Sequence, residues 1–349
     1  MPAIKRKWID LSGEGLIDTA YLKADQTLPL VVKPKLAGTN LIAWARSNRE
    51  LIETQLLKHG GLLFRGFEVA DASEFEQFIR VVSGDLIEYQ ERSSPRSLID
   101  GRIYTSTDHP PDQTIFLHNE QSYNLVFPLR IFFFCVRPAE QGGETLIADS
   151  RKILRRIDPD IRAKLVDRKY MYVRNFGHGF GLDWQTAFQT SDKGAVELYC
   201  REHDIQCEWN DEDQLTTRQV RRVVATHPRT GEDVWFNHAT FFNVSTLDPG
   251  LQRVFANAFA EDDLPNNTYY GDGSPIEPAV MDALREAYIE EQLALSWQSG
   301  DVLMLDNMLA AHGRAPYSGP RKIAVGMSEL YSWSKFVSAI SAALCTLCV

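Results

Sequence analysis

The stretch from Leu117 to Asp149 contains the residues best suited to bind a metal ion. His118 and Glu120 are separated by one residue, at the end of a short apolar run that is predicted to be a strand. Because alternate residues of a strand point to the same face, this imidazole and this carboxylate are expected to project together. Such a pair supplies two of the three ligands of a facial iron site. Alone it is weak evidence, because a solvated His-x-Glu pair on a loop is common.

A third ligand is expected from far downstream. The run SGDVLMLDN (299–307) is predicted to be a strand that leads to His312. Two His and one carboxylate leave three coordination positions for a bidentate cosubstrate and dioxygen. Arg321 opens the next predicted strand, and its guanidinium suits a dicarboxylate because Arg pairs bidentately with carboxylates. Taken singly, His312 is equally well a buried core histidine and Arg321 a surface ion pair. Their joint pattern favours the metal site.

Length and charge restrict the classes of function. The 349 residues are enough to bury a sizeable core, and the net charge of −10 argues against general nucleic-acid binding. The five cysteines are few and odd in number, so a reducing cytoplasm is the expected location. The basic N-terminus lacks the apolar run of a secretory signal, and the apolar tail 336–349 is too short to span a bilayer. A small-molecule or protein partner is expected.

Apolar patterning predicts many short strands and few helices. Helices are predicted over 40–57, 73–82, 150–168 and 278–292, the third in two pieces because of Pro159, with a capping box formed by Ser73 and Glu76. Strands are predicted over 60–67, 114–117, 129–136, 143–148, 294–297, 301–305 and 321–330, a hairpin over 224–237, and loops over 249–275. No glycine-rich dinucleotide motif follows a strand. The pattern favours a mainly β protein with helical decoration around a jelly-roll (double-stranded β-helix) core.

One domain is expected, in four parts. Residues 1–59 are predicted to form an N-terminal arm and helix, 60–150 and 220–335 the jelly-roll core, 151–219 an insertion or lid, and 336–349 the tail. The glycine-rich run 177–181 in the insertion suits a mobile lid, because glycine tolerates large backbone changes. An ordinary surface turn is the equal alternative.

Several motifs resemble the TauD/TfdA-like superfamily of Fe(II)/2-oxoglutarate-dependent dioxygenases. Within it, the nearest branch contains the clavaminate synthase-like and syringomycin-biosynthesis-like enzymes. The motifs are LLFRGF (62–67), LHNEQSY (117–123), PLRIFFFC (128–135), GGETLIAD (142–149), VWFN (234–237), GDVLMLDN (300–307) and HGRAPYSGPRK (312–322). The resemblance implies that His118, Glu120 and His312 bind Fe(II), with 2-oxoglutarate and O2 as cosubstrates.

The resemblance also implies residues for the organic ligands. Arg321 would hold the distal carboxylate of 2-oxoglutarate, and Thr145 would hydrogen-bond the same group. Because the loop after His312 is short, Arg314 is the alternative to Arg321. Candidates for gripping the substrate are Arg92, Arg96, Tyr123 and Asn237. Four further histidines, 109, 178, 227 and 238, are predicted to be structural or on the surface, and His238 is the one expected to approach the site.

The implied activity is oxidation of an amino acid or aminoacyl group, free or tethered to a carrier protein, in natural-product biosynthesis. Hydroxylation is the default outcome, and desaturation, epoxidation or cyclisation are alternatives. Glu120 favours oxygenation, because related halogenases lack this carboxylate. Two other classes stay open: a non-catalytic jelly-roll protein that binds a ligand or carrier, and a zinc hydrolase with the same three ligands. The hydrolase ranks last, because no obvious general base stands beside the metal. No oligomeric state is predicted.

Overall fold

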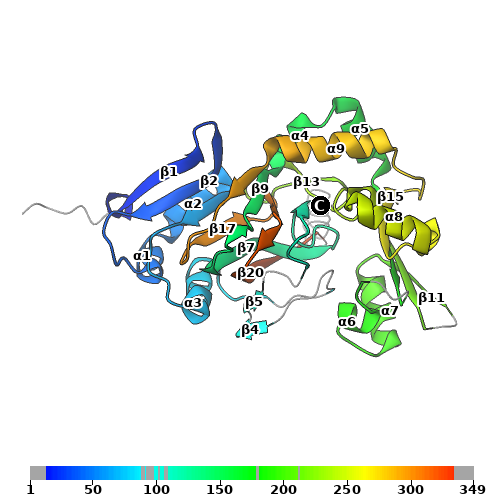
Figure 1. Cartoon of the computed structure of the whole chain (residues 1–349), viewed down its shortest axis with the longest axis horizontal. Coiled ribbons are helices and arrows are strands. Elements are labelled where there is room, and N and C mark those ends of the chain that lie inside the picture. Colours follow the sequence, from blue (N-terminus) through cyan, green and yellow to red (C-terminus); the bar gives the residue numbers. More distant parts are fainter. Residues whose placement is uncertain are drawn as a thin grey trace, which may run out of the picture.

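Two β-sheets form the centre of the computed structural model (Figure 1), which describes residues 13–87, 91, 98–100, 103–105, 109–177, 181–210 and 213–333. The larger sheet contains, in spatial order, β1 (Ile17–Lys23), β2 (Gln26–Pro34), β3 (Gly61–Phe64), β17 (Val302–Asp306), β7 (Val126–Arg137), β20 (Lys322–Ser332), β5 (Ile103–Thr105) and β4 (Leu98–Asp100). The smaller contains β16 (Leu293–Leu295), β9 (Thr145–Asp149), β18 (Ala310–Arg314) and β6 (Ile115–His118). The mainly β, jelly-roll prediction is confirmed.

Apolar side chains from both sheets pack against each other to form the core of the jelly roll. The larger sheet contributes Leu63, Ile131, Phe133, Leu303, Leu305, Val325 and Met327, and the smaller contributes Ile147, Leu293, Leu295 and Ala310. The alternate residues of β7, Phe132 and Phe134, point to the other side, where helices cover them. β7 is therefore buried on both faces, as its nearly continuous apolar run predicts.

Helices α1 (Leu41–Ser47), α2 (Arg49–His59) and α3 (Ala72–Ser83) cover that outer face. The single helix predicted over 40–57 is thus two, separated at Asn48. The predicted capping box is wrong: Asp71 accepts from the Glu74 backbone N–H, and Glu74 accepts from Ala70. The region predicted to be an N-terminal arm also contains two strands of the larger sheet. β1 pairs with β2, and β2 pairs in parallel with β3.

A further sheet lies beside the jelly roll and is separate from its larger and smaller sheets; it is called the second sheet. It consists of β11 (Gln206–Trp209), β12 (Leu215–Arg221), β10 (Tyr170–Phe176) and β15 (Asn266–Tyr270), and α6 (Trp184–Phe188) and α7 (Lys193–Glu202) pack on it. Most of it comes from the region predicted to be an insertion. Its last strand, together with α8 (Pro249–Ala258), comes from residues 249–275, which were wrongly predicted to be loops.

The remaining elements connect these layers. Helices α4 (Ser150–Arg156), α5 (Pro159–Arg168) and α9 (Pro278–Glu291) lie together along one edge, at the top of Figure 1. As predicted, the helix over 150–168 is in two pieces. Short pairs are formed by β13 (Val224–Thr226) with β14 (Asp233–Trp235), and by β8 (Gln141–Gly142) with β19 (Tyr317–Ser318). Single 3-10 turns are η1 (Gly13–Leu16), η2 (Val244–Thr246) and η3 (Glu261–Asp263). None of the helices in the described part of the chain has the length and apolar character that crossing a membrane requires.

Candidate metal centre

His118, Glu120 and His312 meet at one point of the smaller sheet. One ligand atom from each lies within 4.8 Å of the others. The two histidines are direct cross-strand partners on β6 and β18, with ring centroids 4.5 Å apart. His312 Nε2 lies 3.8 Å from Glu120 Oε2. Two imidazoles and a carboxylate on one side of a buried point are a donor set that fits Fe(II) with positions left open.

The orientation of His118 is set by its own strand. Its Nδ1 lies 2.9 Å from the backbone carbonyl of Phe116. A carbonyl only accepts, so Nδ1 carries the hydrogen and Nε2 is the nitrogen that would bind a metal. This hydrogen bond fixes the ring and raises its basicity as a ligand.

Glu120 reaches the site differently from what strand alternation predicts. β6 ends at His118, and Gln121 has a φ of 52°, so the chain reverses immediately after Glu120. The backbone of Glu120 is held by a side chain: Asn307 Oδ1 accepts from Glu120 N at 2.7 Å, and Asn307 Nδ2 donates to Glu120 O at 2.9 Å. The two predicted ligands do converge, but a turn and an asparagine bring them together.

The two candidate arginines lie in different surroundings. Arg314 donates to the backbone carbonyls of His109, Pro110 and Gln113 at 3.2, 2.6 and 2.8 Å, so its guanidinium holds the loop before β6. Arg321 donates through Nε to Gly143 O at 3.1 Å. Burial and the nearby charge of Arg314 lower the pKa of Arg321 to about 10. A cation held in this way is stabilised by an anion.

Gly143 borders Arg321, and Thr145 follows two residues later in the chain. A Cβ on Gly143 would stand 3.1 Å from Cδ and Nε of Arg321, and its φ is +73°, so this position needs glycine to admit the arginine. The Thr145 hydroxyl oxygen accepts from Trp297 Nε1 at 3.0 Å. The hydroxyl hydrogen of Thr145 therefore points elsewhere and can be donated to a further acceptor.

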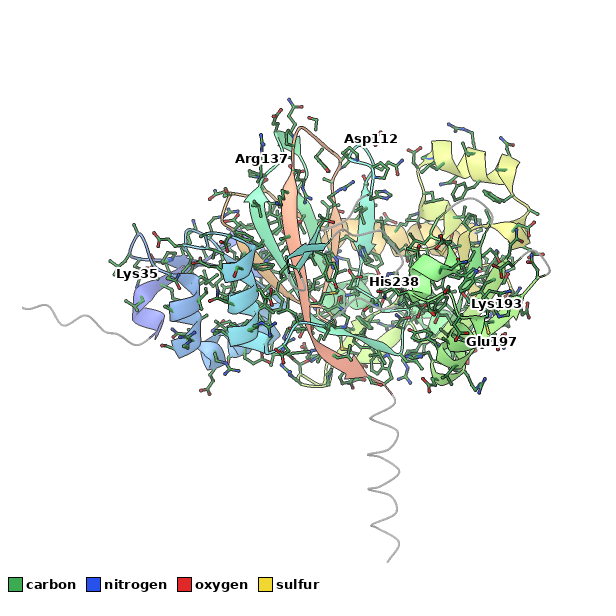
Figure 2. All side chains as sticks on the ribbon, turned by 90° about the horizontal axis from the view of Figure 1, so that it is seen from below. Lys35, Asp112, Arg137, Lys193, Glu197 and His238 are labelled. Carbon is green, nitrogen blue, oxygen red and sulfur yellow. The ribbon has the colours of Figure 1, made fainter. Side chains whose placement is uncertain are left out.

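Aromatic side chains surround the ligands. The ring of Phe241 lies 4.4 Å and that of His238 5.7 Å from His118, and Phe133 lies 5.3 Å from His312. Figure 2 shows His238 in the interior, between the core strands and the segment that carries Lys193 and Glu197. Its Nδ1 is 2.6 Å from Ser122 Oγ. Burial and the neighbouring His118 lower the pKa of His238 well below its usual range. As expected, His238 approaches the site.

The predicted substrate residues have different outcomes. Tyr123 is buried, with its ring 4.9 Å from His238, so it lies one side chain from the ligands. Asn237 donates to Val223 O at 2.8 Å and accepts from Ala239 N at 3.0 Å, so its amide holds a turn and the structure gives no support to a substrate role. Arg92 and Arg96 lie outside the described residues, as do residues 178–180 of the glycine-rich run and the tail 336–349.

Three residues at the centre were missed by the sequence reasoning: Asn307, Trp297 and Phe241. Asn307 stands in the quoted motif GDVLMLDN, yet nothing in a single sequence says that its amide bonds the backbone of Glu120. Trp297 precedes the same strand, and its indole offered no signal beyond that of a core aromatic.

Comparison with known proteins gives consistent results. The model of the family described as "Taurine catabolism dioxygenase TauD, TfdA family" matches residues 24–327. The dapdiamide synthesis protein DdaC of Enterobacter agglomerans is 38% identical over 278 residues, which cover 80% of this chain and 84% of that protein. A clavaminate synthase-like protein of Arabidopsis thaliana is 28% identical over 321 residues, covering 86% of this chain and 93% of that protein.

Solved structures share the fold. The PvcB protein from Pseudomonas aeruginosa matches with a TM-score of 0.55 and 16% identity, covering 90% of this chain and 91% of that one. A second PvcB structure, described as an Fe, alpha-ketoglutarate dependent oxygenase from an isonitrile synthetic pathway, matches with a TM-score of 0.53 and 15% identity, covering 90% of this chain and 92% of that one.

Proposed function

We propose that this chain, which belongs to the taurine catabolism dioxygenase TauD, TfdA family, binds its Fe(II) through His118, Glu120 and His312. The family expected from the motifs is confirmed, and the protein is an Fe(II)/2-oxoglutarate-dependent dioxygenase. The observation that carries the ligand assignment is the convergence of these three side chains within 4.8 Å, although they come from distant parts of the chain.

When bound, Fe(II) couples oxidative decarboxylation of 2-oxoglutarate to succinate with oxidation of a substrate by O2. The residues of this chain supply the rest. His118 would present Nε2 because Phe116 O holds its Nδ1, and Glu120 would contribute negative charge beside the two imidazoles. The rings of Phe133 and Phe241 exclude water from the ligands, which strengthens electrostatic interactions there.

Arg321 is proposed to bind the distal carboxylate of 2-oxoglutarate. Its guanidinium lies in a buried setting that an anion would stabilise, next to Gly143. Thr145, whose oxygen is occupied by Trp297, would donate its hydroxyl hydrogen to the same carboxylate. Arg314 is disfavoured for this task because three backbone carbonyls already accept from its Nη1 and Nη2 groups.

The substrate class is proposed to be an amino acid or aminoacyl group in a natural-product pathway, in the cytoplasm. The named role of DdaC in dapdiamide synthesis supports the pathway type. Hydroxylation is the default, with desaturation, epoxidation or cyclisation as alternatives. A carrier protein that bears the substrate is a further proposal, and Arg92 and Arg96 remain candidates for contact with it or with the substrate.

Anaerobic visible absorption tests the assignment. The metal-free protein, titrated with Fe(II) and then 2-oxoglutarate, is expected to develop a metal-to-ligand charge-transfer band. His118→Ala should abolish this band, and Arg321→Ala should shift its appearance to higher 2-oxoglutarate concentrations. Amino acids and carrier-bound aminoacyl groups are then screened for succinate release.

The other function classes predict different results. Absence of the band from the wild type would overturn the proposal and favour a non-catalytic binding protein. Turnover with zinc and without oxygen would instead indicate a hydrolase.

A further inference from the structure

Asn307 connects two parts of the centre that are far apart in sequence. It directly follows β17, is fully buried, and each of its polar groups has a partner in the segment 119–129. Its backbone N–H donates to Leu129 O at 2.9 Å, and its backbone carbonyl accepts from Asn119 Nδ2 at 2.7 Å. Its side chain bonds both backbone groups of Glu120 and donates to Pro128 O at 2.8 Å.

The side-chain amide of Asn307 does for Glu120 what a neighbouring strand would do. Glu120 lies beyond the end of β6, so no ladder pairs its N–H and C=O. An amide side chain offers one acceptor and two donors in a plane, which matches the acceptor and donor of a peptide unit. Buried backbone groups need such partners, and an unpaired one costs about 1–3 kcal/mol.

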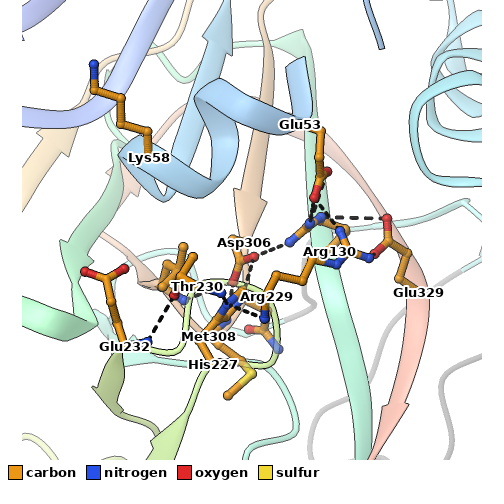
Figure 3. A network of polar contacts seen from close by, with 12 residues as sticks. Glu53, Lys58, Arg130, His227, Arg229, Thr230, Glu232, Asp306, Met308 and Glu329 are labelled. Atoms are coloured by element: carbon orange, nitrogen blue, oxygen red, sulfur yellow. Dashed lines mark hydrogen bonds and ion pairs between the residues drawn. The ribbon is translucent and has the colours of Figure 1, made fainter. Parts of the chain in front are cut away.

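The turn that holds Asn307 is itself fixed. The carboxylate of Asp306 accepts from the backbone N–H groups of Met308 and Leu309 at 3.0 and 3.1 Å. It also pairs with Arg130 and His227 in a buried network, shown in Figure 3. β18, which carries His312, begins directly after this turn. One turn therefore sets both the backbone of Glu120 and the start of the strand that supplies His312.

We propose that Asn307 is a positioning residue that aims the Glu120 carboxylate at the metal by clamping the Glu120 backbone. This inference rests on the proposed function, because it takes Glu120 to be a metal ligand. The side-chain amide of Asn307 bonds the backbone of Glu120 and Pro128, so its proposed effect on the metal runs through Glu120. Residues that orient ligands typically change metal affinity 10- to 100-fold when they are replaced.

Metal affinity, measured without turnover, tests the proposal. Cu(II) is the probe, because it binds nitrogen and oxygen sites most tightly in its series and two histidines alone retain measurable affinity. The metal-free wild type, Asn307→Ala and Asn307→Asp are titrated calorimetrically, and the d–d absorption of each complex is recorded. Both variants are expected to bind Cu(II) about 10- to 100-fold more weakly, with a d–d spectrum that approaches that of Glu120→Ala.

Asn175→Ala is the matched control. Asn175 is also buried, and its Nδ2 donates to two backbone carbonyls, Asp262 O and Leu264 O, both at 2.8 Å, but it lies in the second sheet. Asn175→Ala should lower the melting temperature as Asn307→Ala does and leave Cu(II) affinity and spectrum unchanged. An equal loss of metal affinity in both variants would show that general destabilisation, rather than aim, is responsible.

A double-mutant cycle with Glu120→Ala separates positioning from other effects. If Asn307 acts through Glu120, then Asn307→Ala should have little further effect on Cu(II) affinity once Glu120 is alanine. Additive losses would overturn the proposal, as would unchanged affinity in Asn307→Ala. Failure of the wild type to bind metal would instead overturn the proposed function, which distinguishes the two.

Discussion

The two arginines near the centre show how hydrogen bonds already formed decide a side chain's role. Arg314 lies on the same strand as His312 and pairs with Thr145 of β9. Its position therefore favours it as much as Arg321 for binding 2-oxoglutarate. Nη1 and Nη2 of its guanidinium, however, donate to three carbonyls of one loop. Arg321 bonds Gly143 O through Nε and carries a pKa lowered to about 10 by burial. Role here follows from partners and not from distance along the chain.

We therefore expect Arg321→Gln to raise the KM for 2-oxoglutarate about 10- to 100-fold, since a hydrogen bond to a charged group contributes about 1.5–3 kcal/mol. Arg314→Gln should instead lower the melting temperature, because it releases the loop 109–113, and should change that KM much less. Steady-state succinate formation and thermal unfolding measure the two effects. The reverse pattern would assign the cosubstrate to Arg314.

Trp297 contacts Thr145, which is proposed to bind 2-oxoglutarate, and is expected to act on that site through it. Its indole N–H donates to the Thr145 hydroxyl oxygen, so the hydroxyl hydrogen points away from the indole. Trp297→Phe keeps the ring but removes this hydrogen bond, and we expect it to raise the KM for 2-oxoglutarate about 2- to 10-fold, the effect of one neutral hydrogen bond. In a Thr145→Val background the same substitution should have little additional effect. Equal effects in both backgrounds would indicate that Trp297 acts through packing alone.

At the scale of elements, a buried charge network fixes the end of β17. Asp306 pairs with Arg130 from β7 and with His227 from the turn after β13, and Glu53 of α2 and Glu329 of β20 complete the charges around Arg130. Backbone N–H groups of Arg229 and Thr230 donate to His227 Nδ1, so Nε2 carries the hydrogen that reaches Asp306 at 3.0 Å. The network thereby joins two strands of the large sheet to the turn that precedes His312.

This network predicts a specific loss of stability in acid. Burial alone would raise the pKa of the Asp306 carboxyl, but Arg130 and His227 lower it to about 2. Between about pH 4 and pH 2 the unfolded chain therefore binds the proton and the native one does not, so stability falls as the pH falls. The contribution of Asp306, about 2 kcal/mol, is complete above pH 4 and is lost through this window.

Asp306→Asn should flatten this acid limb. Urea unfolding at pH 6, 4 and 3 should show that the variant is less stable than the wild type at pH 6 and that the gap narrows by about 1 kcal/mol by pH 3, the middle of the window. A gap that is constant with pH would contradict the assigned titration.

The sequence predicted the elements that have strong local signals. β7 is buried on both faces and is nearly all apolar, and Pro159 separates two helices where proline is expected to do so. The predictions from sequence failed for elements whose pairing partners lie far away in the chain. Residues 249–275 are polar and rich in glycine and proline, yet Asn266–Tyr270 becomes a strand because it pairs with β10, which lies far upstream. The N-cap of α3 is Asp71, two residues before the predicted Ser73, and its carboxylate accepts from the Glu74 backbone N–H.

The same distinction between local signals and distant partners applies to the candidate site. The three proposed ligands could be predicted because His and Glu are chemically distinctive and stand in motifs that resemble a known family. The geometry behind them could not, because Asn307, Trp297 and the turn at Gln121 are ordinary residue types whose task appears only when distant segments meet. Strand alternation predicted that His118 and Glu120 project together, and they do converge, but through a turn after β6 and not through a continuous strand.

At the scale of the whole molecule, a metal ion would connect segments that are remote in sequence. His118 ends β6 and Glu120 follows it, whereas His312 lies on β18, and these two strands pair at one edge of the smaller sheet. Without a metal, two imidazoles and a buried carboxylate share this edge. With one, the same groups tie the middle of the chain to its last third.

Removing the metal should therefore lower the stability of the whole fold. A ligand that binds only the native state adds about 2.7 kcal/mol when its concentration is 100 times its Kd. We expect Mn(II), which does not undergo the oxidative reaction, to raise the melting temperature of the chelator-treated protein by a few degrees at that concentration. Asn175→Ala should show the same rise from a lower starting point, because its lost bonds lie in the second sheet. Glu120→Ala and His312→Ala should show little or none. If the melting temperature still rises in both ligand variants, the stabilising Mn(II) binds elsewhere, because binding at the proposed centre requires both side chains.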